Sequence, residues 1–448
     1  MASPFAADSL LHPGFPIRYR LPDSHVRRIR YGLPDAERTG SRSSARGEEM
    51  APESKAGNDR SAVALYVHIP FCCRRCAYCG TFRVAEREAS YDPFLRAVAR
   101  EWSLLRTEME EQAGRPVFAV YVGGGMPSLF GPARLATLLN SLREGLAWAD
   151  DCEVTLEVYP GSFDRDGARI LREAGFNRLH LRVHTFRDAE LAFLERGYTA
   201  DQARAAVGAA REAGFENLSI DLRYGIPGQT TDTWNATLKD SIALNLVHAT
   251  CNQIGRREES VHDRLLRGVF RESPLEESLL SFYQTAVRRL VEAGYQQYEV
   301  ESFARGGNVS RYGLGVWNRR TFYGLGPGAH SFDGAVRWRN AGDLGAYLTR
   351  LLDAGRFPPR ERYRLSPENA VQEVLSLGLR QATGIRWSAL AQYVGPATLA
   401  RLEHKARVLA THGFLDLEAG GIRAKPQSYF VVDSVVLELI RALEDKEA

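Results

Sequence analysis

Beyond the first 60 residues, short apolar runs alternate with amphipathic stretches along the chain. The apolar runs predict buried strands near 63–69, 118–123, 153–159, 178–184, 217–223 and 248–254. The amphipathic stretches predict helices near 92–113, 131–148, 164–174, 200–213 and 231–244. Strands that alternate with helices in this way form a parallel sheet with helices on its outer face. The pattern therefore predicts an α/β fold in which six strand and helix units form an open, partial (β/α)6 barrel.

The segments on either side of the predicted barrel have different patterns. Residues 1–60 are polar and rich in arginine, so we expect a partly disordered extension with little apolar surface to bury. Residues 61–300 form the predicted barrel, and 301–365 form a connecting region with a glycine-rich loop. Ser366 and Pro367 predict the start of a helix, and further helices near 387–393, 397–413 and 434–443 enclose a polar, hairpin-like segment. Residues 366–448 are therefore predicted to form a winged-helix-like domain.

Composition and net charge indicate which kinds of partner, such as nucleic acid or a membrane, the protein is expected to bind. The chain has 448 residues, of which 44% are hydrophobic and 25% charged, and its formal net charge is +3. This near balance gives no reason to expect a nucleic-acid partner. We find no run of about 18 apolar residues and no basic start followed by an apolar core in residues 1–15. We therefore expect a cytoplasmic protein that does not bind a membrane.

Four of the six cysteines lie in one short stretch, 72–79, which reads CCRRCAYC. Cys72, Cys76 and Cys79 have the spacing C-x3-C-x2-C, which lacks the paired arrangement of a common zinc site. Three thiolates on one loop can hold three corners of a 4Fe–4S cluster and leave one iron open. Cys73 breaks this spacing, and we interpret it as a bystander, with ligation by Cys73 as the alternative. A purely structural zinc or iron–sulfur site is the alternative for the whole group.

Further residues suited to chemistry lie at the ends of predicted strands. Glycines 123–125 follow the second strand, where they let the backbone approach a ligand closely. Glu157, His184 and Asp221 fall on the third, fourth and fifth strands. A carboxylate in a mostly apolar strand needs a partner, because burying it alone costs several kcal/mol. That partner is either a neighbouring arginine such as Arg182, Arg196 or Arg223 or a cationic or hydroxyl group of a ligand.

Several motifs then match one known family in order. They are YVHIPFC at 66–72, GGGMP at 123–127, NRL at 177–179, VHTF at 183–186, RG at 196–197, IDLRYGIPGQT at 220–230 and FYGLGPGAHS at 322–331. Together they resemble the oxygen-independent coproporphyrinogen III oxidase (HemN/HemW) family of radical S-adenosylmethionine (SAM) proteins, over about 62–440. The segment after 365 also resembles the carboxyl-terminal domain of that family. We therefore expect it to act as a lid or a wall of the site and not to bind DNA.

The resemblance implies a 4Fe–4S cluster on Cys72, Cys76 and Cys79 and two SAM molecules side by side. The positions that match residues around the SAM on the cluster are Tyr66, Gly124, Glu157 and His330. The positions that match residues around the second SAM are Tyr78, Gly125, Met126, His184, Arg196, Asp221 and Gly255. Met126 and His184 depart from the usual pattern, in which threonine and glutamine are common. A flavodoxin-type or ferredoxin-type electron donor is also implied.

Two departures favour one activity within that family. Coproporphyrinogen oxidases usually read CGC at the last cluster cysteine, whereas residues 79–81 read CGT. Haem chaperones usually carry HNxxYW before the glycine-rich loop, whereas residues 312–317 read YGLGVW, with Tyr312 and Gly313 replacing the histidine and asparagine. These differences favour the remaining group, the class C radical SAM methyltransferases and cyclopropanases, and predict that haem is not a ligand.

The resulting hypothesis is a monomeric enzyme that transfers a methyl or methylene group to an sp2 carbon of a small-molecule substrate. In that family chemistry, a 5'-deoxyadenosyl radical from one SAM takes a hydrogen atom from the methyl group of the second. His184, Tyr159 and Tyr224 are candidates for the proton step because they should lie at strand ends. The alternative is a porphyrin-handling protein, either a coproporphyrinogen III oxidase or a haem chaperone.

Overall fold

The computed structural model describes residues 62–444 except 75, 77–78, 109–114 and 255–275. The extension predicted for residues 1–60 lies outside the described residues, as do Tyr78 and Gly255.

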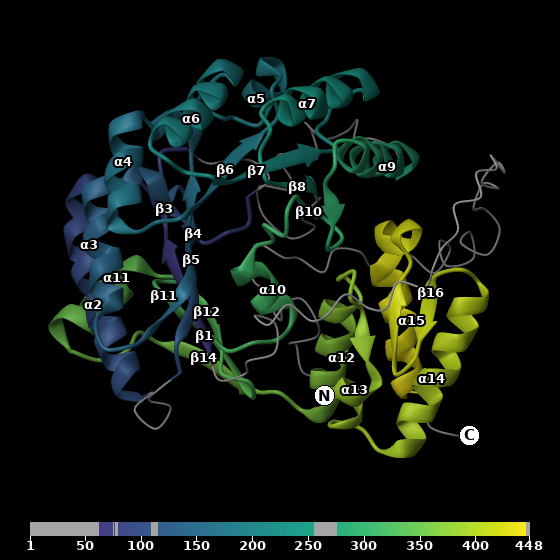
Figure 1. Cartoon of the computed structure of the whole chain (residues 1–448). Helices are drawn as coiled ribbons and strands as arrows, with labels where there is room; N and C mark the ends of the chain where they lie inside the picture. The colour runs from purple at the N-terminus through teal and green to yellow at the C-terminus, as the bar shows by residue number, and fades with distance from the viewer. Residues whose placement is uncertain (1–61, 75, 77–78, 109–114, 255–275, 445–448) are drawn as a thin grey trace.

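The six predicted strands are confirmed, and they lie side by side and parallel in chain order (Figure 1). They are β1 (Val63–Ile69), β4 (Val117–Gly124), β5 (Trp148–Val158), β6 (Arg178–His184), β7 (Asn217–Tyr224) and β8 (His248–Gln253). Their apolar side chains are almost all buried, as in β1, where all seven residues are buried. Parallel strands covered on both faces are expected to be apolar in this way.

Helices cover the outer face of this sheet (Figure 1). They are α2 (Tyr91–Glu108), α3 (Pro132–Arg143), α4 (Arg165–Ala174), α5 (Asp188–Phe193), α6 (Ala200–Glu212), α7 (Thr231–Ala243) and α9 (Glu276–Glu292). Thr199 and Thr230 begin α6 and α7 with capping boxes that satisfy free backbone amides. The helix predicted for 131–148 ends earlier, at Arg143, because Gly145 adopts a φ of 83° and β5 begins at Trp148.

The sheet extends beyond the predicted barrel at both edges. Next to β1, β11 (Phe322–Leu325) pairs in parallel and leads to antiparallel strands β12 (His330–Phe332), β13 (Val336–Asn340) and β14 (Arg360–Arg364). Next to β8, β10 (Ser302–Ala304) and β9 (Gln296–Gln297) complete the 12-stranded sheet. The region 301–365, predicted as a connection, therefore supplies strands to both edges. It also contains α10 (Arg311–Trp317), α11 (Leu344–Leu348) and a π-helical turn, η5 (Thr349–Asp353).

The carboxyl-terminal region packs as a separate group of helices around a small sheet, coloured green to yellow in Figure 1. Its elements are α12 (Pro367–Gly378), β15 (Ile385–Arg386), α13 (Trp387–Ala391), α14 (Pro396–Thr411), β16 (Leu415–Glu418), β17 (Gly421–Ala424) and α15 (Val432–Glu444). The predicted cap is present, since the Ser366 side chain accepts a hydrogen bond from the Asn369 amide. The hairpin of β16 and β17 beside these helices confirms the winged-helix-like arrangement.

A buried cluster of charges joins this region to the sheet. Glu373 of α12 accepts hydrogen bonds from Arg337 of β13, at 2.5 and 3.0 Å, and from Arg319, at 3.0 Å. The Glu373 side chain is 3% exposed, so these charge-assisted bonds are shielded from water.

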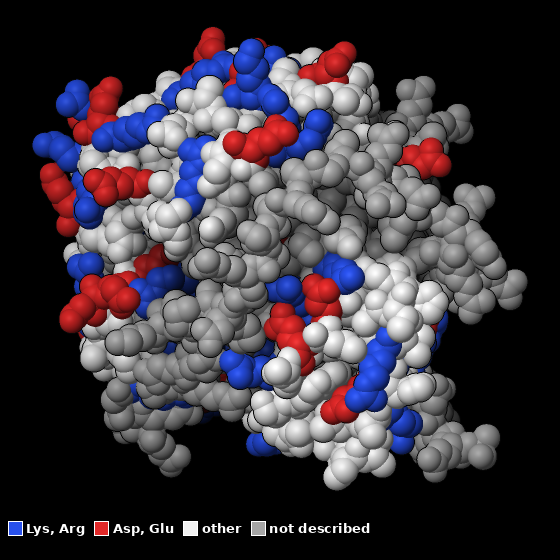
Figure 2. All heavy atoms as spheres, turned by 45° about the vertical axis from the view of Figure 1, so that its right-hand side comes forward, with Lys and Arg blue, Asp and Glu red and all other residues white. Residues whose placement is uncertain are grey.

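The surface mixes charges of both signs, and Figure 2 shows lysine and arginine side chains interspersed with acidic ones on the face drawn. Within the described part of the chain, no helix is long and apolar enough to cross a membrane.

Candidate cluster and ligand site

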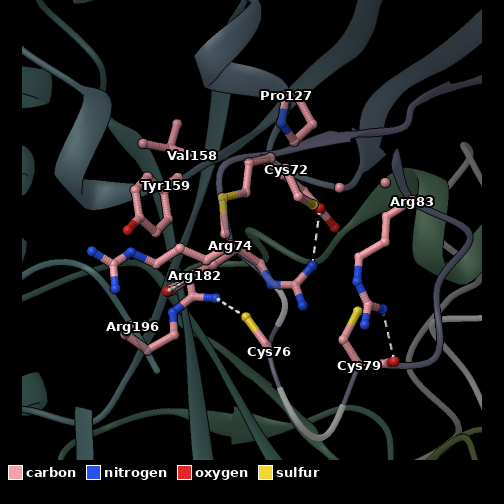
Figure 3. A pocket seen from close by; sticks show the side chains of 14 residues that line it. Cys72, Arg74, Cys76, Cys79, Arg83, Pro127, Val158, Tyr159, Arg182 and Arg196 are labelled. Carbon is pink, nitrogen blue, oxygen red and sulfur yellow. Dashed lines mark hydrogen bonds and ion pairs between the residues drawn. The ribbon is translucent and has the colours of Figure 1, made fainter. Parts of the chain in front are cut away.

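The three predicted cluster cysteines line one pocket at the carboxyl end of the barrel (Figure 3). Cys72 ends β2 (Phe71–Cys72), which follows β1 directly and pairs with β3 (Val84–Ala85). Cys72 and Cys76 are buried and Cys79 is half-buried. Cys73 is exposed, is not part of the lining, and directs its thiol at the Met126 sulfur, 3.5 Å away. Cys73 therefore lies apart from the three cysteines of the pocket lining.

The residues of this pocket fit a 4Fe–4S cluster. Three cysteine thiols line it together, and a cluster takes each thiolate on a different iron. Burial, together with the nearby Cys79 and Cys76 thiols, raises the pKa of the Cys72 thiol to about 12. Binding to iron would therefore be needed to hold it as a thiolate near neutral pH.

Glycine creates the space in front of the cysteine loop. A Cβ atom on Gly125 would lie 2.8 Å from the Cys72 sulfur and 2.6 Å from the Phe71 carbonyl oxygen. Gly124 adopts a φ of 118°, which side chains other than glycine rarely allow. The end of β4 can therefore lie against the cluster loop because these positions lack side chains.

Glu157 brings a carboxylate from β5 into the same pocket. It accepts hydrogen bonds from the Tyr121 hydroxyl at 2.8 Å and from Arg182 at 3.0 Å. Burial would raise the pKa of this carboxyl, but Arg182, His180 and these hydrogen bonds outweigh that effect and hold it below its usual range. Glu157 is therefore ionised at neutral pH, and the ion pair considered from the sequence is present.

Behind Glu157, three tyrosine rings stack inside the barrel. Tyr312 of α10 lies 4.9 Å from Tyr121 and 6.1 Å from Tyr66, measured between ring centroids. The Tyr66 hydroxyl bonds to His68 Nδ1, and His68 Nε2 donates to the Phe82 carbonyl, so Tyr66 has a fixed orientation. The Tyr312 side chain is buried, and its hydroxyl has no hydrogen-bond partner within the described part of the chain.

Four arginines line the pocket: Arg74, Arg83, Arg182 and Arg196. Arg182 contacts both Glu157 and Asp221, at 3.0 and 3.3 Å. The Arg196 guanidinium lies within 5.3 Å of the ring centroids of both Tyr159 and Tyr198 and donates to the Cys76 sulfur at 3.4 Å. Figure 3 shows Arg83 beside Cys79 at one side of the pocket, and Arg74 and Arg196 on the side of Tyr159.

On the β6 to β8 side of the barrel, polar residues bind one another instead of lining the pocket. Asp221 accepts from Asn252 at 2.7 Å and Arg223 at 3.2 Å, and His184 Nδ1 lies 3.5 Å from it. His184 is fully buried with a φ of 72°, where β6 is irregular. Burial, followed by the nearby Arg196, lowers the pKa of His184 well below its usual value, so the ring is neutral.

A second polar chain crosses the same three strands. His180 Nδ1 and His248 Nδ1 both bond to the Ser219 hydroxyl, at 2.8 and 2.7 Å. His248 Nε2 continues the chain to the Tyr298 hydroxyl at 2.8 Å.

The structure thus brings most, but not all, of the predicted residues to the pocket. The lining includes Cys72, Cys76, Cys79, Gly124, Gly125, Met126, Glu157, Tyr159 and Arg196. Tyr66, His184, Asp221 and His330 lie outside this lining. Tyr224 points to the opposite face of the sheet, where its ring packs near Trp234 and Tyr283, so the prediction of a catalytic Tyr224 does not fit its position. Side chains of a strand alternate between faces, and Tyr224 falls on the helix-covered one.

The sequence did not single out Arg74 and Arg83 as part of the site. The sequence did contain an indication that both arginines could belong to the site. Each lies within four residues of a candidate cluster cysteine, on the loop that reads CCRRCAYCGTFR from Cys72. What was missing was their direction, since a loop residue can point into the pocket or away from it.

Comparison with known proteins agrees with this fold and site. Residues 66–241 match the radical SAM superfamily, and residues 365–431 match the HemN C-terminal domain. The solved structure of coproporphyrinogen III oxidase (HemN) from Escherichia coli superposes with a TM-score of 0.73, covering 84% of this chain and 90% of that one at 24% identity. The fold and site therefore define a radical SAM protein, a class that implies a 4Fe–4S cluster and SAM.

The curated relatives show which family within the radical SAM class this chain resembles. The haem chaperone HemW of Synechocystis is 31% identical over 359 residues, which is 78% of this chain and 84% of that protein. HemW of Bacillus subtilis is 29% identical over 334 residues, covering 74% and 87%. The chain belongs to the HemN-like family of radical SAM proteins.

These relatives overturn the activity predicted from the sequence. The curated relatives described above are named haem chaperones, so transfer of a methyl group or formation of a cyclopropane has no support. The prediction of a methyltransferase or cyclopropanase was wrong because it depended on two short departures, at 79–81 and 312–317. A match over three quarters of the chain carries more weight than a few positions.

Proposed function

We propose that the protein handles haem or a closely related porphyrin, in the manner of the haem chaperones to which it is similar. The observation that carries this proposal is the match to HemW proteins across both the barrel and the carboxyl-terminal region. The earlier expectation that haem is not a ligand is therefore withdrawn.

The pocket supports the proposal through its shape and charge. It is concave, and aromatic and apolar groups such as Tyr159, Val158 and Pro127 lie beside its arginines. A porphyrin presents a flat apolar ring and carboxylates at its edge, so it suits walls of this kind. The cluster, when bound to the three cysteines, would supply one-electron chemistry next to that surface.

The proposal does not use Tyr312 as an iron ligand. Tyr312 occupies the position at which haem chaperones usually have a histidine, but burial and the nearby Glu157 raise the pKa of its hydroxyl above the usual value. Iron is bound by the deprotonated oxygen, and this site disfavours that form. We therefore place haem at the pocket opening and not against Tyr312.

Two further elements belong to the proposal. One SAM would be held near Glu157 and Gly124, and a second near Met126 and Arg196, as the family resemblance implies. A flavodoxin-type or ferredoxin-type protein would supply the electron. Equilibrium binding of SAM to the anaerobic protein, with the bound amount compared with the iron content, measures whether one or two molecules bind.

Haem titration tests the proposed function directly. Protein reconstituted with its cluster under anaerobic conditions is titrated with ferric haem while the Soret absorbance is followed. Saturable binding of one haem per chain is expected. Absorbance that rises without saturation, as it does with a protein that adsorbs haem non-specifically, would overturn the proposal.

A further inference from the structure

The pocket carries more positive charge than its own carboxylates balance. Among the described residues that line it, Glu157 is the one carboxylate, facing four arginines. Arg182 is paired with Glu157 and Asp221, and Arg196 is directed at Cys76 and the carbonyl of Arg182. Arg182 is thus paired within the protein, and Arg196 is turned towards a candidate cluster cysteine.

Arg74 and Arg83 are in a different state. Arg83 donates to the Cys79 carbonyl at 2.9 Å, a contact that orients the guanidinium but does not neutralise it. Arg74 is exposed and lies beside Gly197, where a Cβ atom would come within 2.5 Å of its Nε. Neither arginine forms an ion pair with any residue that the structure describes, so both can receive an anionic group without breaking an existing pair.

The position of these arginines indicates the kind of ligand. Arg83 lies beside Cys79, whereas Arg74 lies beside Gly197 and Tyr159, so the two occupy separate points of the pocket (Figure 3). A ligand with one carboxylate would use one of them, whereas a ligand with carboxylates at separate points of its edge can use both. Arginine suits this task because its planar fork binds a carboxylate through two parallel hydrogen bonds.

Gly197 supports this assignment for Arg74. A side chain at position 197 would collide with the Arg74 guanidinium and with the Tyr159 hydroxyl, which accepts a hydrogen bond from the Gly197 amide at 3.0 Å. Tyr159 and Gly197 thus form a surface on which Arg74 lies, facing the pocket that both Arg74 and Tyr159 line.

We propose that Arg74 and Arg83 bind two carboxylates of a tetrapyrrole, which for haem are the two propionates on adjacent pyrrole rings, and so select a ligand with two carboxylates. The inference rests on the proposed function, because it names how the same pocket recognises its ligand. It also assigns a binding role to the arginines that flank the cluster cysteines in the sequence.

The experiment compares ferric haem with haem dimethyl ester, in which both propionates are neutral. Cluster-loaded wild-type protein is titrated with each compound in the same mild detergent. Variants Arg74→Gln and Arg83→Gln follow, with Arg165→Gln as control, because Arg165 is 70% exposed on α4 and outside the pocket lining. Iron content and the cluster absorbance confirm that each variant is loaded.

The inference predicts that each of the two variants, and esterification in the wild type, weakens binding about tenfold or more. The control should bind haem as the wild type does, and the ester should bind all proteins equally weakly. Arg83→Lys and Arg74→Lys, which keep the charge, should recover part of the affinity.

The outcomes separate the two proposals. Saturable haem binding that is the same for the ester and for both glutamine variants would overturn the inference and leave the proposed function in place. Absence of saturable haem binding to wild type would overturn both. The ester comparison uses the wild type alone, so the inference stays testable if Arg83→Gln fails to hold its cluster.

Discussion

Glu157 and Asp221 are both carboxylates on strands of the barrel, but only one of them is in a position to contact a ligand. Glu157 of β5 lines the pocket beside the cluster cysteines, whereas Asp221 of β7 lies outside the lining with its oxygens taken up by Asn252, Arg223 and Arg182. Both are ionised and both contact Arg182. The difference is that Glu157 faces space that a ligand can enter.

The same contrast holds for the surrounding residues. On the pocket side, Arg74 and Arg83 have no acidic partner among the described residues. On the β6 to β8 side, His180, Ser219 and His248 are joined in one hydrogen-bonded chain. A group whose hydrogen bonds are made within the protein is structural, while a group that lines a pocket with spare capacity can act on a ligand.

The largest expected effect is on the cluster. Replacing Cys72, Cys76 or Cys79 with serine should abolish cluster loading, because each thiolate holds one iron. Cys73→Ser is the matched control and should keep full iron content, since Cys73 is exposed and outside the lining. Iron analysis and visible absorption after anaerobic reconstitution measure this, and loss of the cluster in Cys73→Ser would contradict the assignment.

The second largest effect is expected on the stability of variants of Asp221 and Glu157. Asp221→Asn should lower the free energy of unfolding by about 3 kcal/mol, because it leaves buried arginine charge uncompensated. Glu157→Gln should cost less, because Arg182 keeps Asp221 as a partner. Denaturant unfolding of both variants checks the order, and an equal loss would show that Glu157 is also structural.

Ligand binding should reverse that order. Glu157→Gln should weaken SAM binding by about 1.5–3 kcal/mol while the iron content stays unchanged, because a charge-assisted contact to the SAM ammonium is lost. Asp221→Asn should affect SAM binding less. Equilibrium dialysis with labelled SAM measures both, and unchanged SAM affinity in Glu157→Gln would remove Glu157 from the site.

A smaller effect concerns pH. Burial lowers the pKa of both His68 and His180 to about 4, below the value near 6.5 expected in the unfolded chain. At pH values between these two pKa values, the unfolded chain therefore binds protons at these histidines that the folded protein does not bind. Stability should be full above about pH 6.5 and fall by about 1.4 kcal/mol per pH unit for each histidine as the pH drops towards 4.

His180→Asn tests this slope against His404→Asn, where His404 is exposed in α14. The first variant should lose less stability between pH 6.5 and 4, because it lacks the one proton that unfolding adds at His180. Chemical denaturation at several pH values provides the slopes. Equal slopes in all three proteins would mean that His180 is protonated in the folded state.

The smallest effect is expected at Tyr312. Tyr312→Phe removes a buried hydroxyl that has no hydrogen-bond partner within the described residues, so stability should change by less than about 1 kcal/mol or increase. The haem spectrum should also be unchanged, because haem is placed at the pocket opening. A loss of haem binding in this variant would instead identify Tyr312 as a ligand of the iron.

Much of the fold was readable from local pattern. The six strands of the barrel and the helices at α2, α4, α6 and α7 follow the apolar periodicity closely, and the cap at Ser366 is formed. The pairing of β11 with β1 was not predicted, because Phe322–Leu325 is short and lies among glycines that resemble a loop. The two paired strands are about 260 residues apart in the sequence, and a pairing over that distance produces no pattern in the residues nearby.

The site, like the fold, could be predicted from the sequence only in part. The spacing of the cysteines predicted which three line the pocket, since neighbouring residues on one loop must lie together. The sequence also placed Glu157, Tyr159 and Tyr224 at strand ends, but it could not tell which face each occupies, and Tyr224 lies on the other one.

The sequence by itself indicated the three candidate cluster cysteines, the alternation of strands and helices, and the family, because these depend on spacing and on residue types along the chain. The tertiary structure decided which charged groups neutralise one another. Arg182 lies between Glu157 and Asp221, on strands that are far apart in the sequence, and this leaves Arg74 and Arg83 for a ligand. Charge balance depends on distances of a few ångströms between distant residues, and such distances exist only after the chain has folded.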